Sequence, residues 1–119
     1  EHGGRAVVLS GDTRFSPALI DVAHGVDLLV HEVAIAPPDL SPAAPYYRAY
    51  ALHTSPERAA EVFTRARPRL AVYSHIVAFG NSDEATIVPR TRRSYQGPLL
   101  LGQDLLSVRV GDTTSTPRP

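Results

Sequence analysis

The sequence contains no cysteine, no methionine and no tryptophan. The absence of cysteine excludes disulfides, thiolate metal sites and a cysteine nucleophile, so a metal ion would have to be bound by histidine and carboxylate side chains. Twelve basic and twelve acidic residues give a formal net charge of zero. No overall positive field therefore attracts nucleic acid or an anionic membrane, and a polyanion would have to be bound by a local group of residues.

Long apolar runs are missing as well. No stretch approaches the roughly 20 apolar residues that cross a bilayer, so we expect no membrane association. The start Glu1-His2-Gly3-Gly4 has neither the basic nor the apolar region of a signal peptide. Cytoplasmic and periplasmic locations are equally compatible with the sequence. The 119 residues, 43% of them hydrophobic, suffice for one small domain.

Short apolar runs alternate with helix signals along the chain. Gly3-Gly4 predicts a hairpin turn, and the strand that follows it is the second arm of a hairpin whose first arm lies upstream. The order of strand, helix and strand predicts an α/β fold with a parallel pair and a crossover. The predicted strands are residues 5–10, 27–31, 70–75 and 99–101, with a closing strand at 105–110.

Two helix starts are well marked. Ser16-Pro17 and Ser55-Pro56 each combine an N-cap residue with proline at the first helical position, and the helices should end near Gly25 and Pro68. A third helix begins near Ser82 and is expected to be shortened by Pro89. The proline-rich and tyrosine-rich residues 36–52 predict a loop, and residues 113–119 predict a disordered tail.

Residues that bind metals or move protons follow three of these strands. They are Asp12, the pair His31-Glu32, and His75, while His53 directly precedes the second capped helix. Because the carboxyl ends of parallel strands line one edge of an α/β sheet, these groups are expected to converge there. Each also has a structural interpretation: an Asx-turn for Asp12, a buried structural histidine for His31, a surface carboxylate for Glu32, and a helix start for His53.

Taken together, four segments resemble the second half of the metallo-β-lactamase superfamily, most closely its ribonuclease Z and zinc arylsulfatase-like branch. They are Ser10-Gly11-Asp12-Thr13-Arg14, His31-Glu32-Val33-Ala34, His53-Thr54-Ser55 and Ser74-His75. The resemblance runs from about residue 5 to Asp112 and implies half of an αββα sandwich, with a mixed sheet and flanking helices. The family's His-x-His-x-Asp-His motif is absent, which implies a chain truncated or cleaved between the two halves.

The resemblance also implies roles for the site residues. Asp12 would bridge two metal ions and His75 would bind one of them, while Glu32 and His53 would transfer protons. Zn²⁺ is the expected metal, with Mn²⁺ and Fe²⁺ as alternatives. The implied reaction is cleavage of a phosphodiester or a sulfate ester by a metal-bound hydroxide. The chain alone is expected to be inactive without its N-terminal half.

Other functions stay open at this stage. A lactamase or a thioesterase would use the same fold, and a metal-free association module would account for the missing ligands. The exposed apolar face of the half-fold is expected to be covered by a partner chain, either the complementary half or a second copy. Val33-Ala34 stands where the branch has Ala-Thr, and Thr54-Ser55 stands where it has Ser-Thr. These two differences weaken the link to ribonuclease Z itself. The basic residues Arg90, Arg92 and Arg93 form one local cluster, better explained as a solvated helix face. Small esters therefore rank above transfer RNA precursors as expected substrates.

Overall fold

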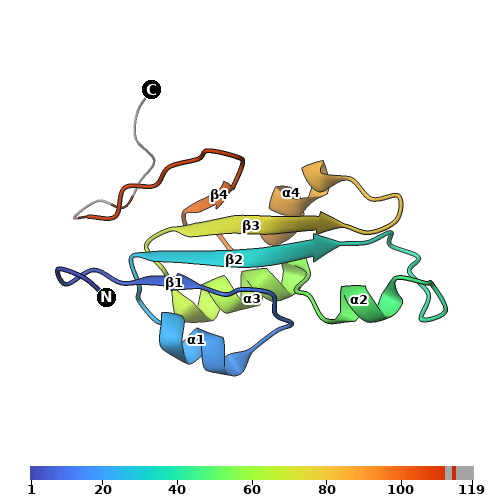
Figure 1. Cartoon of the computed structure of the whole chain (residues 1–119), viewed down its shortest axis with the longest axis horizontal. Helices are drawn as coiled ribbons and strands as arrows, with labels where there is room; N and C mark the ends of the chain where they lie inside the picture. The colour runs from blue at the N-terminus through green and yellow to red at the C-terminus, as the bar shows by residue number, and fades with distance from the viewer. Residues whose placement is uncertain (112–113, 115–119) are drawn as a thin grey trace.

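The structure, a computed structural model, describes residues 1–111 and residue 114. Its centre is a four-stranded sheet in the order β1-β2-β3-β4, in which every neighbouring pair is parallel (Figure 1). The α/β prediction is confirmed, but the mixed sheet is corrected, because the named strands of the described residues are all parallel. The strands are β1 (Val7–Leu9), β2 (Leu28–Ile35), β3 (Ala71–Ala78) and β4 (Leu99–Leu101).

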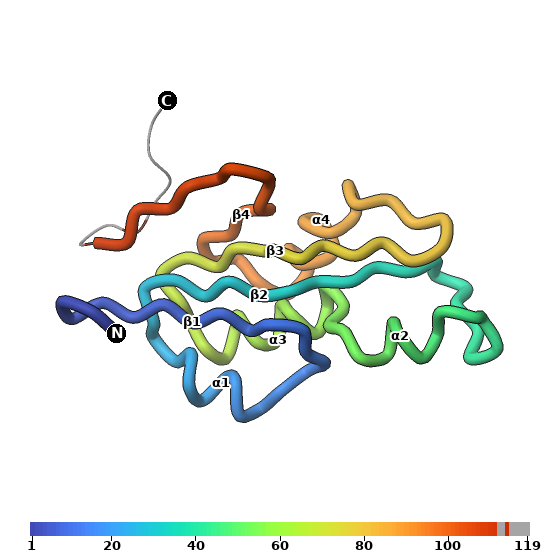
Figure 2. The backbone as a smooth tube through the Cα atoms, in the orientation of Figure 1, coloured from blue at the N-terminus to red at the C-terminus, as the bar shows by residue number. Residues whose placement is uncertain are grey.

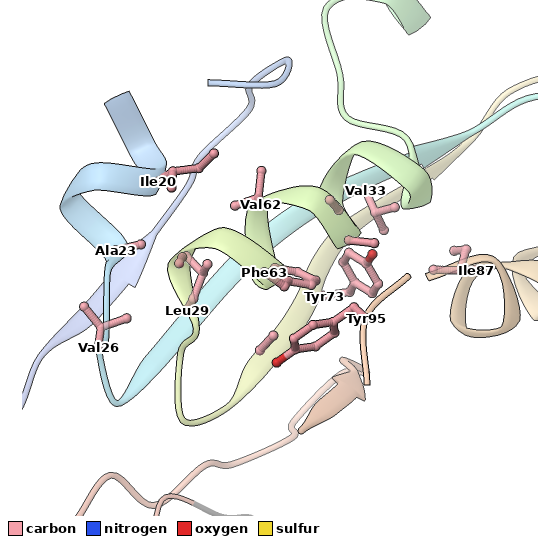
Figure 3. Packing of buried hydrophobic residues seen from close by; sticks show 14 of the residues in the cluster. Ile20, Ala23, Val26, Leu29, Val33, Val62, Phe63, Tyr73, Ile87 and Tyr95 are labelled. Atoms are coloured by element: carbon pink, nitrogen blue, oxygen red, sulfur yellow. The ribbon is translucent and has the colours of Figure 1, made fainter. Parts of the chain in front are cut away.

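The helices pack on one face of this sheet through a single hydrophobic core (Figure 3). Ile20 of α1, Phe63 of α3 and Ile87 of α4 meet Leu29 and Tyr73 of the two central strands there. α3 lies between α1 and α4. The elements on this side are α1 (Pro17–Ala23), α3 (Pro56–Ala66) and α4 (Ile87–Thr91), the last preceded by the 3₁₀ turn η1 (Glu84–Thr86).

The predicted helix starts are confirmed at atomic detail. The Ser16 hydroxyl accepts a hydrogen bond from the Leu19 amide, and the Ser55 hydroxyl accepts one from the Arg58 amide, each at 3.2 Å. Both caps use the free N–H groups of a first helical turn. Pro89 does not break α4, because it is the third residue of that helix, where the missing N–H has no helical partner to lose.

Four details of the predicted elements are wrong. β2 and β3 continue past their predicted ends at residues 31 and 75, to Ile35 and Ala78. Within the predicted loop 36–52 lies the short helix α2 (Tyr47–Ala51), and residues 105–110 form no named strand.

Gly3-Gly4 does form a tight turn, closed by reciprocal His2 and Arg5 backbone bonds of 2.9 Å. Apart from residue 114, the predicted tail 113–119 lies outside the described residues.

The opposite face of the sheet carries a second, smaller apolar cluster. Leu28, Leu70 and Val72 are buried there against the segment that follows β4, which runs back along the sheet, opposite to β3 (Figure 2). This cover is partial, because the Leu9 side chain on β1 is 70% exposed. None of the described helices has the length and apolar character of a membrane span.

Candidate functional site

The Glu32 carboxylate is the centre of a buried hydrogen-bond network. Glu32 lies in the middle of β2 and is only 2% exposed, although it is a charged residue. Oε1 accepts the Thr13 amide at 2.8 Å and contacts His53 Nδ1 at 3.0 Å, and Oε2 accepts the Thr54 amide at 3.4 Å. One carboxylate therefore joins β2 to two segments that are far from it in the sequence, at Thr13 and at His53-Thr54.

His53 is held in one orientation by this network. It follows α2 and directly precedes Thr54, whose hydroxyl donates to the Thr13 carbonyl at 2.5 Å and whose carbonyl accepts the Ala34 amide at 2.8 Å. Since the carboxylate of Glu32 can only accept, His53 carries a proton on Nδ1. Nε2 is then the ring nitrogen outside this contact, and the ring stays partly accessible, with 15% of the side chain exposed.

Asp12 and His75 form a second pair, which is open to solvent. Asp12 Oδ1 and His75 Nε2 are 3.1 Å apart, and the two side chains are 67% and 56% exposed. The position of His75 comes from a bulge in the sheet: Glu32 pairs with Ser74 but Val33 pairs with Ile76, so His75 is an extra residue on β3. Its positive φ of 49° belongs to this bulge, which redirects a side chain that a regular strand would place differently.

The two pairs are neighbours. The rings of His53 and His75 stack with centroids 6.1 Å apart and planes inclined by 28°. The structure thus brings together Asp12, Glu32, His53 and His75. The prediction that these residues meet at the carboxyl ends of strands is wrong for Glu32 and His75. Both lie within strands, and the bulge between β2 and β3 brings them close together.

The donor chemistry of the open pair suits a divalent metal such as zinc, which binds imidazole nitrogen and carboxylate oxygen. Two donors do not make a closed site, however. Across residues 1–111 and 114, no group of three or more histidine, cysteine, aspartate or glutamate side chains could hold a metal ion. Asp12 and His75 fit a metal ion by their donor atoms, but two donors alone do not complete a site for one.

Two shallow clefts beside His53 are lined by residues that were not predicted to belong to the site. Arg14 and His53 line both clefts, one with Asp12 and the other with Phe15 and Arg58. The Arg58 guanidinium lies 4.2 Å from the centre of the Phe15 ring. The available sequence signal was proximity: Arg14 stands two residues after Asp12, and Arg58 stands in the first turn of the helix that follows His53.

No family model matches the sequence. Ribonuclease Z of Bacillus subtilis is 41% identical over 107 residues, which are 90% of this chain and 33% of that protein. Ribonuclease Z of Myxococcus xanthus is 33% identical with the same coverage. The chain thus spans about a third of the length of these relatives.

Two solved structures share the fold. The metallo-β-lactamase fold protein YhfI from Bacillus subtilis superposes with a TM-score of 0.69 at 17% identity, over 87% of this chain and 39% of that one. A diphosphatase of the PhnP family superposes with a TM-score of 0.51 at 16% identity, over 86% and 33% of the two chains.

Proposed function

We propose, since this chain belongs to the metallo-β-lactamase superfamily and to its ribonuclease Z branch, that it supplies the proton-transfer residues of a metal-dependent phosphodiester hydrolase. The observation that carries this proposal is the buried Glu32–His53 pair. Its 3.0 Å contact joins a fixed carboxylate to a histidine with one free ring nitrogen, the arrangement that general acid catalysis requires.

His53 is the proposed acid. Nε2 gives a proton to the leaving oxygen as the ester bond breaks, and Glu32 keeps Nδ1 protonated and stabilises the charged imidazole ring beforehand. Because Glu32 also accepts the Thr13 and Thr54 amides, its orientation does not have to be established during the reaction. Such a positioned acid contributes a factor of about 10² to 10⁴ to the rate.

Asp12 and His75 would hold the metal. When bound, a zinc ion at such a site polarises water and the substrate oxygen, with Mn²⁺ and Fe²⁺ as alternatives. The resemblance implies two zinc ions, for which Asp12 and His75 would supply two of the ligands. The chain's own contribution is to place one carboxylate oxygen and one imidazole nitrogen 3.1 Å apart, beside the ring of His53.

The clefts next to His53 support an anionic substrate. Arg14 lines both clefts and Arg58 lines one of them, so a negatively charged ester would be attracted to the side of the acid despite the zero net charge of the chain. The relatives carry the name ribonuclease Z, which favours RNA phosphodiesters over the small esters that the sequence analysis ranked first. Sulfate esters present a similar tetrahedral anion and are the alternative.

The remaining part of the enzyme is proposed to be the N-terminal half of the same fold. The chain covers about a third of its relatives, its metal-binding pair needs further donors, and the sheet face next to Leu9 is incompletely covered. An apolar face of this kind favours a protein partner. The 119-residue chain by itself should bind zinc weakly and hydrolyse nothing, and tightly held, stoichiometric zinc on its monomer would contradict this.

The function is tested by comparing substrates with one preparation of the zinc-loaded complete protein. A short oligoribonucleotide, bis(4-nitrophenyl) phosphate, 4-nitrophenyl sulfate and a β-lactam are offered in parallel. We expect cleavage of both phosphodiesters to exceed that of the sulfate ester and of the lactam. An enzyme that opened the β-lactam and left all three esters intact would refute the proposal.

A further inference from the structure

His31 is a fully buried histidine next to Glu32, and the mechanism above does not use it. Its ring packs edge-on against Phe63 of α3, with centroids 5.9 Å apart. Nδ1 lies 2.7 Å from the carbonyl oxygen of Glu32. Nε2 has no hydrogen-bond partner within the described part of the chain.

This environment fixes the protonation of the ring. Because the Glu32 carbonyl can only accept, Nδ1 carries the proton and Nε2 holds a lone pair. Burial lowers the pKa of His31, in agreement with a neutral ring. A buried nitrogen without a partner destabilises the folded protein, so leucine would be more stable than histidine at this apolar position. A histidine here is explained if its Nδ1–H group has a function.

The group that His31 holds lies at the irregular point of the sheet. The register between β2 and β3 shifts between Glu32 and Val33, opposite the extra residue His75. The Nδ1–H bond therefore anchors the backbone of β2 at the bulge. At the bulge, Glu32 on β2 contacts His53, and His75 on β3 contacts Asp12.

We infer that His31 is a positioning residue, whose Nδ1–H anchors the Glu32 carbonyl at the bulge and thereby directs the Glu32 carboxylate toward His53. Its effect on catalysis rests on the proposed function, but its effect on the geometry does not. Losing this anchor should disturb the acid first, because Glu32 is the residue that His31 holds directly.

Three substitutions separate the anchor from the bulk of the ring. Asparagine places an amide nitrogen near the position of Nδ1 and keeps the donor, glutamine places it near Nε2, and leucine removes it. The exposed His24, at the end of α1, provides the control variant His24→Asn. All variants are made in the complete protein loaded with zinc.

The first readout is the dependence on the leaving group. His31→Gln and His31→Leu should lose about 10²-fold on a dinucleotide, whose alkoxide needs a proton, and less than about threefold on bis(4-nitrophenyl) phosphate, whose leaving group does not. His31→Asn and His24→Asn should stay close to the unsubstituted protein on both substrates. Equal losses on both substrates, or an Asn variant as poor as the Gln variant, would overturn the inference.

The second readout is independent of activity. In ¹⁵N-resolved NMR spectra, the His53 Nδ1–H signal should be protected from solvent exchange by Glu32 in the unsubstituted protein and in His31→Asn, and unprotected in His31→Gln. If the protein cleaves no ester but these spectra behave as expected, the function fails and the positioning role stands. If the signal stays protected in His31→Gln, the positioning role is refuted. Should His31→Leu not fold, the Asn and Gln variants still decide.

Discussion

The two polar pairs of the site differ in how completely this chain builds them. Glu32 is 2% exposed and bound by two amides and His53, so the Glu32–His53 pair is held in place by the chain itself. Asp12 and His75 are more than half exposed and make a single contact with each other. If the proposed function holds, the chain carries a complete acid pair and only part of the metal site.

Removing either member of the open pair should have the largest effect. Asp12→Ala and His75→Ala in the complete protein are expected to release metal and to reduce hydrolysis to background, because a metal ligand is needed before any other group can act. Metal content by atomic emission and activity are measured on the same samples. Asp21→Ala on the exposed side of α1 is the control. Full metal occupancy in Asp12→Ala would show that this carboxylate is not a ligand.

The buried pair should respond differently. Glu32→Gln and His53→Ala are expected to keep the metal while losing about 10²- to 10⁴-fold in rate, the range for losing a general acid. Since the two residues act as one unit, the double variant should be no slower than the worse single variant. Loss of metal in either single variant would reassign that residue as a ligand, and additive losses would separate the two roles.

The parts of the fold that the sequence predicted are those with a strong local signal. Ser55-Pro56 marks the start of α3, and the apolar runs place β2 and β3 on the buried centre of the sheet. α2 was missed because the prolines and tyrosines of residues 36–52 suggest a loop, and only the five residues Tyr47–Ala51 of this segment are helical. In residues 105–110, Leu106, Val108 and Val110 pack against the sheet, but the segment forms no named strand, so the predicted strand there is wrong.

The predicted proximity of Asp12, Glu32, His53 and His75 is confirmed, but the geometric reason for it was not predicted and their roles stay predictions. Motif resemblance selected Glu32 and His75, while the strand-end argument for their convergence failed, since β2 and β3 both continue. The bulge at His75 depends on a one-residue register shift between two strands, which periodicity within one strand cannot reveal. The anchoring contact of His31 with the Glu32 carbonyl likewise exists only because both lie at this bulge.

A smaller effect should come from the charged cleft. Arg14→Ala is expected to raise KM for an oligoribonucleotide about tenfold and to reduce the slope of log(kcat/KM) against log salt concentration by about one, as expected for one lost phosphate contact. The matched control is Arg65→Ala, because Arg65 is an exposed arginine on α3 that pairs with Glu61 outside the clefts. Identical salt slopes for the Arg14 variant and the unsubstituted protein would exclude a phosphate contact.

The smallest expected effect is a pH dependence of stability that belongs to His31. Burial lowers the pKa of His31 in the folded protein below the ordinary 6.5, so the folded state is favoured while the ring is neutral. The free energy of unfolding therefore keeps its full value above pH 6.5 and decreases as the pH falls from 6.5 toward the folded-state pKa. The decrease is at most about 1.4 kcal/mol per pH unit. Urea unfolding at pH 7.5 and 5.5 should show a larger decrease for the unsubstituted protein than for His31→Asn. Equal decreases would indicate that His31 does not contribute.

The central claim is that Glu32 and His53 transfer a proton while Asp12 and His75 bind metal. A series of aryl and alkyl phosphodiesters whose leaving groups span a wide range of pKa tests this claim most directly. Rates of the zinc-loaded complete protein and of its His53→Ala variant are plotted against leaving-group pKa. The account predicts that the two lines meet at nitrophenyl esters and diverge as the leaving group becomes poorer, with equal metal content in both proteins. Parallel lines, separated by the same factor at every leaving group, would contradict a proton-donating role for His53.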